Sequence, residues 1–246
     1  MLLLLATAAR AQDALVAGAD ADRLESGHGG GASLLWLHSR ASGTFSAGAA
    51  FRTLPGTRWA YGTLGLTHRL TPLTTLNGEA SLGGGSDDGG RFRYLLLRGG
   101  VTRELLAKRL YGEAEWLQVD VARQQEGLVR LGAMYLPRPR LALRASVYEA
   151  LFGDSDTTLG TLRADYDFGR ITAIGGFSGG TALPVLLQQT GNDAVRVREA
   201  FGGVAFDAAS RRWTVMLSNL SSGGEDRRRL SVSCRIPLAS PTAGGR

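Results

Sequence analysis

The sequence predicts an all-β protein, a single antiparallel transmembrane β-barrel of about 14 strands, with about 12 as the alternative count. Three observations support this fold class. Segments with alternating apolar and polar side chains recur along the whole chain, the connections between them alternate in length, and aromatic residues gather near the segment ends. These are the features of a membrane barrel with short periplasmic turns and longer extracellular loops.

The segment TLRADYDFG, residues 161–169, shows the alternation clearly. Arg163, Asp165 and Asp167 occupy every second position, and apolar side chains from Leu162 to Phe168 fill the positions between them. In a β-strand, successive side chains point to opposite faces, so one face is apolar and the other is charged. A membrane barrel turns the apolar face to lipid, whereas a soluble β-sandwich buries it in a protein core. This segment alone is compatible with both folds.

Period-two alternation predicts strands from end to end, and helical periodicity is not sustained for long. The first three predicted strands could be merged or frayed, which gives the alternative count of about 12. The predicted strands are 14–24, 32–41, 44–53, 58–70, 74–83, 91–102, 109–121, 128–136, 140–151, 159–168, 170–178, 199–207, 212–220 and 229–238.

From residue 71 onward the connections alternate between short and long. Short ones such as 71–73 and 137–140 alternate with longer polar ones such as 84–90 and 222–228. Outer-membrane barrels place the short set in the periplasm, and an even strand number returns both termini to that side. The longest connection, 179–197, has an apolar centre and is expected to form an extracellular loop or a lumen plug, with a short extra strand equally compatible.

Aromatic residues are expected to form two girdles where the strands cross the membrane interfaces. In a soluble β protein they would be ordinary aromatic residues at strand ends. The expected periplasmic girdle contains Tyr135, Tyr166, Phe168, Phe206 and Trp213. The expected outer girdle contains Trp59, Tyr61, Phe92, Tyr94 and Phe177.

The polar faces of the same strands predict a lumen of mixed charge. In the segment 44–53, Phe45 and Phe51 face outward while Arg52 faces inward, and the register of the other strands is assigned in the same way. Charges in such a lumen brace each other across the barrel or line a path for polar solutes. The predicted lumen-lining residues are Arg52, Glu79, Glu113, Glu115, Arg130, Arg144, Arg163, Asp165, Asp167 and Arg235.

The composition argues against several other classes of protein. The 35 glycines are roughly twice the ordinary share of about 7%, which suits tightly curved sheets. The net charge of +6 comes from arginines scattered among acidic residues, which is not the patch of a nucleic-acid-binding protein. Beyond the first residues no apolar run approaches the roughly 18 residues that a transmembrane helix needs. A soluble secreted β-sandwich is the competing fold.

The N-terminus resembles a secretory signal peptide. The apolar run Leu2 to Leu5 precedes small residues, and Ala9-Arg10-Ala11 fits the A-x-A cleavage pattern. The usual basic first region is missing, which a start codon assigned too far downstream would explain; a buried first strand is the alternative. We therefore expect a signal peptide at 1–11, the barrel at 12–238 and a C-terminal tail at 239–246.

No catalytic or metal-binding pattern stands out in the sequence. The three histidines are dispersed and Cys234 is the single cysteine, so we expect no metal site, no cofactor and no intrachain disulfide. The glycine-rich stretches 27–33 and 83–90 lack the features of phosphate-binding loops and are interpreted as flexible turns. His28 beside Ser26 is the nearest approach to a catalytic set, and we expect no enzymatic activity.

The signal peptide, the regularly spaced amphipathic strands and the small residues at lumen positions resemble those of bacterial outer-membrane β-barrels. Among these, the chain is similar to the barrels found with exopolysaccharide secretion systems, including the YaiO-type family. Such barrels usually end on an aromatic residue that the assembly machinery recognises. Here the last strand ends with Ile236 and Leu238, so either this signal is degenerate or the strand lies in a larger assembly.

The combined expectation is a Gram-negative outer-membrane barrel that provides or assists passage of a polar solute or polymer through a charged lumen. The resemblance implies an exopolysaccharide as that polymer. The alternative is a non-transporting barrel that anchors a surface or secretion complex through its loops. Expected partners are outer-membrane lipids, the barrel-assembly machinery and a secretion complex, and no nucleic acid. The oligomeric state is left open.

Overall fold

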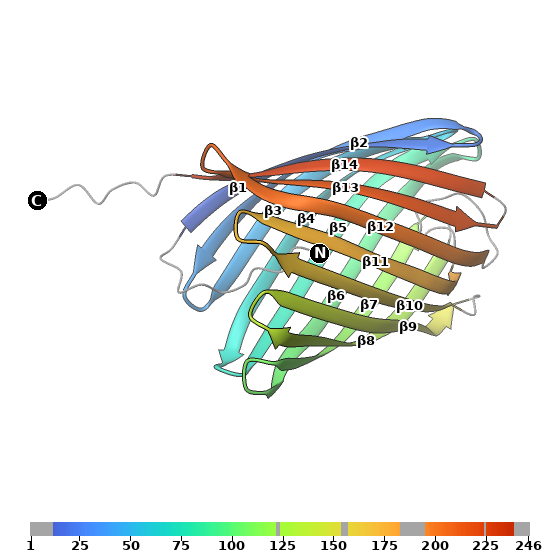
Figure 1. Cartoon of the computed structure of the whole chain (residues 1–246). Coiled ribbons are helices and arrows are strands. Elements are labelled where there is room, and N and C mark those ends of the chain that lie inside the picture. The colour runs from blue at the N-terminus through green and yellow to red at the C-terminus, as the bar shows by residue number, and fades with distance from the viewer. Residues whose placement is uncertain (1–11, 122–123, 154–156, 183–194, 224, 239–246) are drawn as a thin grey trace, which may run out of the picture.

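The computed structural model describes residues 12–121, 124–153, 157–182, 195–223 and 225–238 (Figure 1). They form one closed barrel in which neighbouring strands pair antiparallel in chain order, from β1 to β14. The prediction of a single all-β barrel of about 14 strands is confirmed, and the alternative of about 12 is excluded. The described residues contain no helix that is long and apolar enough to cross a membrane.

The strands are long and run obliquely around the barrel (Figure 1). Their bounds are β1 Gln12–Leu24, β2 Gly27–Arg40, β3 Gly43–Leu54, β4 Thr57–Thr71, β5 Thr74–Asp87, β6 Gly90–Leu106, β7 Leu110–Val121, β8 Gln124–Arg138, β9 Leu141–Gly153, β10 Thr158–Asp167, β11 Ile171–Ala182, β12 Val195–Ala208, β13 Arg211–Ser222 and β14 Glu225–Pro237.

The first and last strands close the barrel side by side. They pair without a break from Ala14 opposite Pro237 to Leu24 opposite Arg227. The start of β1 and the end of β14 therefore lie at one end of the barrel, here called the terminal end (left in Figure 1), and the opposite end is called the distal end. The last strand thus completes the barrel of its own chain, although it lacks a terminal aromatic residue.

Several predicted loops at the distal end are strand in the structure. Most of 84–90 belongs to β5 and β6, and most of 222–228 belongs to β14. The stretches 27–33 and 83–90, interpreted as flexible turns, lie largely within strands, so that interpretation is wrong. The glycine and polar residues there continue the hydrogen-bonded pairing of the sheet beyond its more apolar part.

Some of the predictions fall on residues outside the described ranges. Strand β1 begins at Gln12, the residue predicted to start the mature chain. The predicted signal peptide, the C-terminal tail at 239–246 and the centre of the connection 179–197 lie outside the described residues. The signal peptide, the tail and the plug or loop role of that connection stay predictions.

The outer wall of the barrel is apolar. Leu82, Leu162 and Phe51 are 68%, 61% and 49% exposed, and they belong to strands on different sides of the barrel. In a soluble sandwich these side chains would meet in a dry core, and their exposure excludes that fold. A closed sheet whose apolar face points outward satisfies all its backbone groups in lipid, so the strands span a membrane.

Three of the five residues expected in the periplasmic girdle are exposed at the terminal end, and the other two, Phe206 and Trp213, are half-buried in the same outward register. Tyr135, Tyr166 and Phe168 are exposed on the outer wall, and the rings of Tyr166 and Phe168 lie 4.6 Å apart, centroid to centroid. Phe177, which is expected in the outer girdle, is 50% exposed on the outer wall near the middle of β11. The other residues expected in the outer girdle are not on this wall, as described below.

Candidate functional site: an ion-paired lumen

The concave face of the barrel is identified by contacts between strands that are not neighbours. Arg52 of β3 forms ion pairs with Asp20 and Asp22 of β1, although β2 lies between these strands. Side chains from strands two apart converge on the concave side of a closed sheet and diverge on the convex side. The residues that share this inward register include Arg52, Glu79, Glu113, Glu115, Arg130, Arg144, Arg163, Asp165, Asp167 and Arg235.

A first group of charges lies in the lumen near the distal end and joins β1, β3 and β14. At its centre the Asp22 carboxylate, whose side chain has 0% exposure, accepts hydrogen bonds from three arginines. Arg52 Nη2 donates at 2.5 Å, Arg227 Nε at 2.9 Å and Arg229 Nε at 2.8 Å. Such charge-assisted bonds offset the cost of burying a carboxylate. This distal ion cluster consists of Asp20, Asp22, Arg52, Arg227 and Arg229.

Of the distal ion cluster, Arg52 is among the residues predicted to line the lumen, whereas Asp22 is not. The alternation of β1 did contain a signal, because Asp20 and Asp22 stand at every second position among alanines. The alternation alone does not show which residues pair with Asp22. Asp22 lies opposite Arg229 of the last strand, and that pairing exists once the barrel has closed.

Glycine on β2 makes room for the contact between β1 and β3. Gly31 pairs with Asp20 on one side and with Arg52 on the other. A Cβ atom at Gly31 would lie 3.0 Å from Oδ2 of Asp20 and 2.9 Å from the carbonyl oxygen of Phe51. The glycine-rich stretch 27–33 therefore leaves a gap in the inner wall through which Arg52 reaches β1.

A second group of charges crosses the inner wall from β6 to β10. Glu115 is bound by Arg98 from one side and by Arg130 from the other, where Nη1 donates at 3.2 Å. Arg130 also donates through Nη2 to Glu113 at 2.8 Å. Across β8, Arg144 Nε lies 3.7 Å from Glu113. This central belt consists of Arg98, Glu113, Glu115, Arg130, Arg144, Arg163 and Asp165.

Positive and negative side chains nearly balance in the central belt. Arg130 and Glu113 have 5% and 6% of their side chains exposed, so this pair is part of the wall. Arg163, which donates to Asp165 of the same strand at 2.8 Å, retains 29% exposure and Asp165 retains 25%. The belt therefore braces one side of the lumen while presenting accessible charges at its β10 end.

The lumen contains accessible space at the level of the belt. Glu79 faces inward on β5, opposite Arg98 of β6, and yet it is exposed. A barrel of eight strands is filled by its own side chains, and one of about 14 strands is wider. An inward carboxylate that stays exposed indicates a water-filled space beside it.

The remaining residues expected in the outer girdle, from β4 and β6, face the lumen instead. Trp59 is 7% exposed and pairs with the inward Arg52. The rings of Tyr61 and Tyr94 are stacked, with centroids 4.8 Å apart. The prediction for these residues is wrong because an amphipathic ring suits either face and the strand register decides. This lumen aromatic patch consists of Trp59, Tyr61, Phe92 and Tyr94, which pack with Leu24 and Leu54.

Glycines on β5 explain why these rings fit against the inner wall. A Cβ atom at Gly85 would lie 2.5 Å from Cζ of Phe92 and 2.6 Å from Cβ of Trp59. At Gly83 it would lie 2.7 Å from Cβ of Tyr61. The rings of β4 and β6 thus lie close over a strand segment that has no side chains of its own.

The structure does not bring His28 and Ser26 together as a catalytic pair. His28 is exposed on the outer wall opposite Arg23, whereas the Ser26 hydroxyl donates to Glu225 at 2.7 Å. Among the described residues no cluster of His, Cys, Asp or Glu could hold a metal ion.

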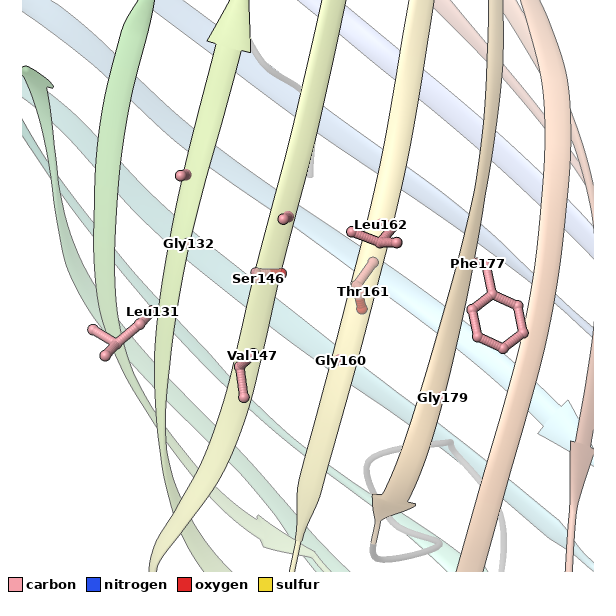
Figure 2. A pocket seen from close by; sticks show the side chains of 11 residues that line it. Leu131, Gly132, Ser146, Val147, Gly160, Thr161, Leu162, Phe177 and Gly179 are labelled. Carbon is pink, nitrogen blue, oxygen red and sulfur yellow. The ribbon is translucent and has the colours of Figure 1, made fainter. Parts of the chain in front are cut away.

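A shallow hollow of about 560 Å³ lies on the outer wall, across β8 to β11, and Figure 2 shows the residues that line it. Gly160 lies between Leu131 and Phe177, which stand at two sides of the hollow. Leu131 and Phe177 belong to the apolar outer face of the barrel. The hollow is a feature of the lipid-facing surface and is separate from the lumen.

No family model and no curated protein matches this sequence. Several solved structures are similar to the barrel. One is the TodX deltaS2S3 mutant, a monoaromatic hydrocarbon channel, which is 12% identical with a TM-score of 0.72. The match covers 94% of this chain and 92% of that chain. The fold is that of outer-membrane channels. The CymD monoaromatic hydrocarbon channel is 10% identical with a TM-score of 0.67, over 95% and 90% of the two chains. The KdgM porin, in complex with disordered oligogalacturonate, is 10% identical with a TM-score of 0.50, over 89% and 97%.

These likenesses agree with the physical features of the wall. A closed antiparallel barrel with an apolar exterior and a charged interior is the architecture that spans the outer membrane of bacteria. The expectation of a bacterial outer-membrane β-barrel is confirmed.

Proposed function

We propose that the protein is a passive channel for small polar solutes, with both termini in the periplasm. The observation that carries this proposal is Glu79, an inward carboxylate that remains exposed beside the central belt. Accessible ionic groups in a lumen replace part of the hydration shell of a passing solute. The belt supports this role because its paired charges keep the wall polar without offering a tight binding site.

The near balance of charge in the belt supports weak selectivity between anions and cations. Glu115 is held by arginines on both sides, and Glu113 by Arg130 and Arg144 on one side, so the fields of both carboxylates are largely cancelled within the wall. Accessible charges of the described lumen include those of Glu79, Arg163 and Asp165. A solute with several hydroxyl or mixed charged groups matches this lining better than a simple ion.

A monoaromatic solute is the second candidate, and the lumen aromatic patch favours it. Stacked rings such as Tyr61 and Tyr94 offer π-faces to a passing aromatic ring, and each such contact contributes about 0.5–1.5 kcal/mol. The structurally similar TodX and CymD are monoaromatic hydrocarbon channels. An aromatic solute with a polar substituent would meet the aromatic patch first and the central belt next.

A more specific version of the transport proposal takes an exopolysaccharide as the solute. It rests on the sequence resemblance to YaiO-type barrels. The proposal of a secretion complex and the barrel-assembly machinery as partners rests on the same resemblance. The charged lumen is compatible with a hydrated polymer because its groups bind water and hydroxyl groups alike.

Conductance of the purified full-length barrel in a planar bilayer tests the proposal. A channel is expected to show stepwise conductance. The anchoring barrel, which is the alternative, is expected to show none. In a salt gradient, the Glu79→Lys variant should shift the reversal potential toward that of the anion. Glu79→Gln, which removes the charge and keeps the shape of the side chain, should shift the reversal potential less. A silent wild-type barrel that inserts normally would overturn the channel proposal.

A further inference from the structure

Two arginines face each other on the outer wall at the distal end. Arg23 of β1 and Arg228 of β14 are directly opposite in the pairing that closes the barrel, and both are exposed. Within the described part of the chain, neither forms an ion pair with a carboxylate. Like charges directly opposite each other destabilise a sheet. An anion bound between them would remove that repulsion.

Further polar side chains extend this pair sideways. His28 on β2 lies opposite Arg23, and Asn219 on β13 lies opposite Arg228. Arg198 of β12, also exposed, stands nearer the distal rim on the same outer face. Two exposed acidic residues are close, Asp226, opposite Ser221, and Glu25, two residues after Arg23. The row from His28 to Asn219, here called the outer basic row, therefore has an excess of positive charge.

Below the outer basic row the wall is hollowed and apolar. A hollow of about 630 Å³ is lined by the row and, toward the middle of the barrel, by Ala21, Leu217 and Leu230. Leu217 and Leu230 are 61% and 44% exposed. Positive donors above an apolar hollow on a membrane-facing wall match a lipid with an anionic headgroup.

We propose that the outer basic row binds the phosphates of a bisphosphorylated glycolipid of the outer leaflet, with an acyl chain in the hollow beneath. This rests on the proposed orientation, which turns the distal end to the cell exterior. The row crosses about 14 Å, three strand spacings of roughly 4.8 Å, which is wider than a single phosphate. Guanidinium groups bind phosphate oxygens in a bidentate manner, so Arg23 and Arg228 anchor one phosphate and Arg198 lies toward the second.

Native mass spectrometry of the full-length barrel in detergent, titrated with bisphosphorylated lipid A, tests the site. The double variant Arg23→Gln/Arg228→Gln is expected to bind lipid A about tenfold more weakly than the wild type. The matched control is Arg58→Gln/Arg93→Gln, because these arginines are also exposed on outward positions near the distal end but lie away from the hollow. The control should bind lipid A like the wild type.

Two outcomes would overturn the proposal. One is unchanged lipid A affinity in Arg23→Gln/Arg228→Gln, provided that the shift of the folded band on an unheated gel shows a folded barrel. The other is equal wild-type affinity for phosphatidylglycerol and lipid A, which would indicate general attraction to anionic lipid. The conductance of the double variant should equal that of the wild type, so a failed lipid site and a failed channel proposal are distinguished.

Discussion

Arg52 donates a hydrogen bond to Asp22 at 2.5 Å, although the strands that carry them are separated by β2. Arg227 of β14 binds the same carboxylate. The distal ion cluster therefore links β1 to β3 on one side and to β14 on the other. On the inner wall of the barrel, it stabilises the pairing of the first strand with the last.

Removing the charge of Asp22 should strongly destabilise the barrel. Asp22→Asn leaves Arg52, Arg227 and Arg229 around a neutral amide, and breaking a buried pair by removing one partner costs about 3–5 kcal/mol. Urea unfolding in lipid vesicles, followed by tryptophan fluorescence, measures the change. The matched control is Asp207→Asn, whose pair with Arg212 is 57% and 42% exposed, and which should cost about 0–1 kcal/mol. Equal effects of the two changes would contradict the buried role of Asp22.

Gly31→Ala should lower the free energy of unfolding because its Cβ has no room. The new atom would meet Asp20 Oδ2 at 3.0 Å and a backbone oxygen at 2.9 Å, an overpacking that costs about 1–3 kcal/mol. Gly99→Ala is the control, since a Cβ there meets nothing within 4 Å. The temperature at which the folded band disappears on a gel compares the two variants, and identical temperatures would argue against a packed gap on β2.

Glu115→Gln should make the lumen more anion-selective. Arg98 and Arg130 both bind this carboxylate, so its loss leaves two guanidinium groups without their shared partner in the wall. The reversal potential in a salt gradient is expected to move toward that of chloride. Glu149→Gln, on the outward register at the distal end of β9, should leave the potential unchanged. A cation-selective Glu115→Gln channel would show that the belt does not line the ion path.

Tyr94→Ala separates the two candidate solutes, because Tyr94 is a half-buried ring of the lumen aromatic patch. If aromatic compounds pass, block of the ionic current by a small aromatic acid should weaken about threefold or more, the equivalent of roughly 0.7 kcal/mol of ring contact. Phe177→Ala removes a ring from the outer wall and should leave the block unchanged. Equal block in the wild type and in Tyr94→Ala would favour the purely polar solute.

The sequence by itself determined the fold class and the two faces of most strands. Period-two alternation needs no knowledge of neighbours, because the pleat alone sends Leu162 and Arg163 to opposite sides. The inward positions of Glu113, Arg130 and Arg144 followed from the same rule. Long aliphatic and ionic side chains differ enough in hydration free energy that each has one acceptable face in a membrane barrel.

Tertiary structure decided which inward residues meet and where ambiguous residues point. Trp59 and Tyr94 suit either face, and the register of β4 against β3 and of β6 against β5 places them in the lumen. Asp22 meets Arg227 because the chain closes on itself, a contact between residues far apart in sequence. Glycine-rich stretches that suggest turns in the sequence are strand segments in the structure. Side chains of neighbouring strands occupy the space above these glycines, and this packing is visible only in the folded barrel.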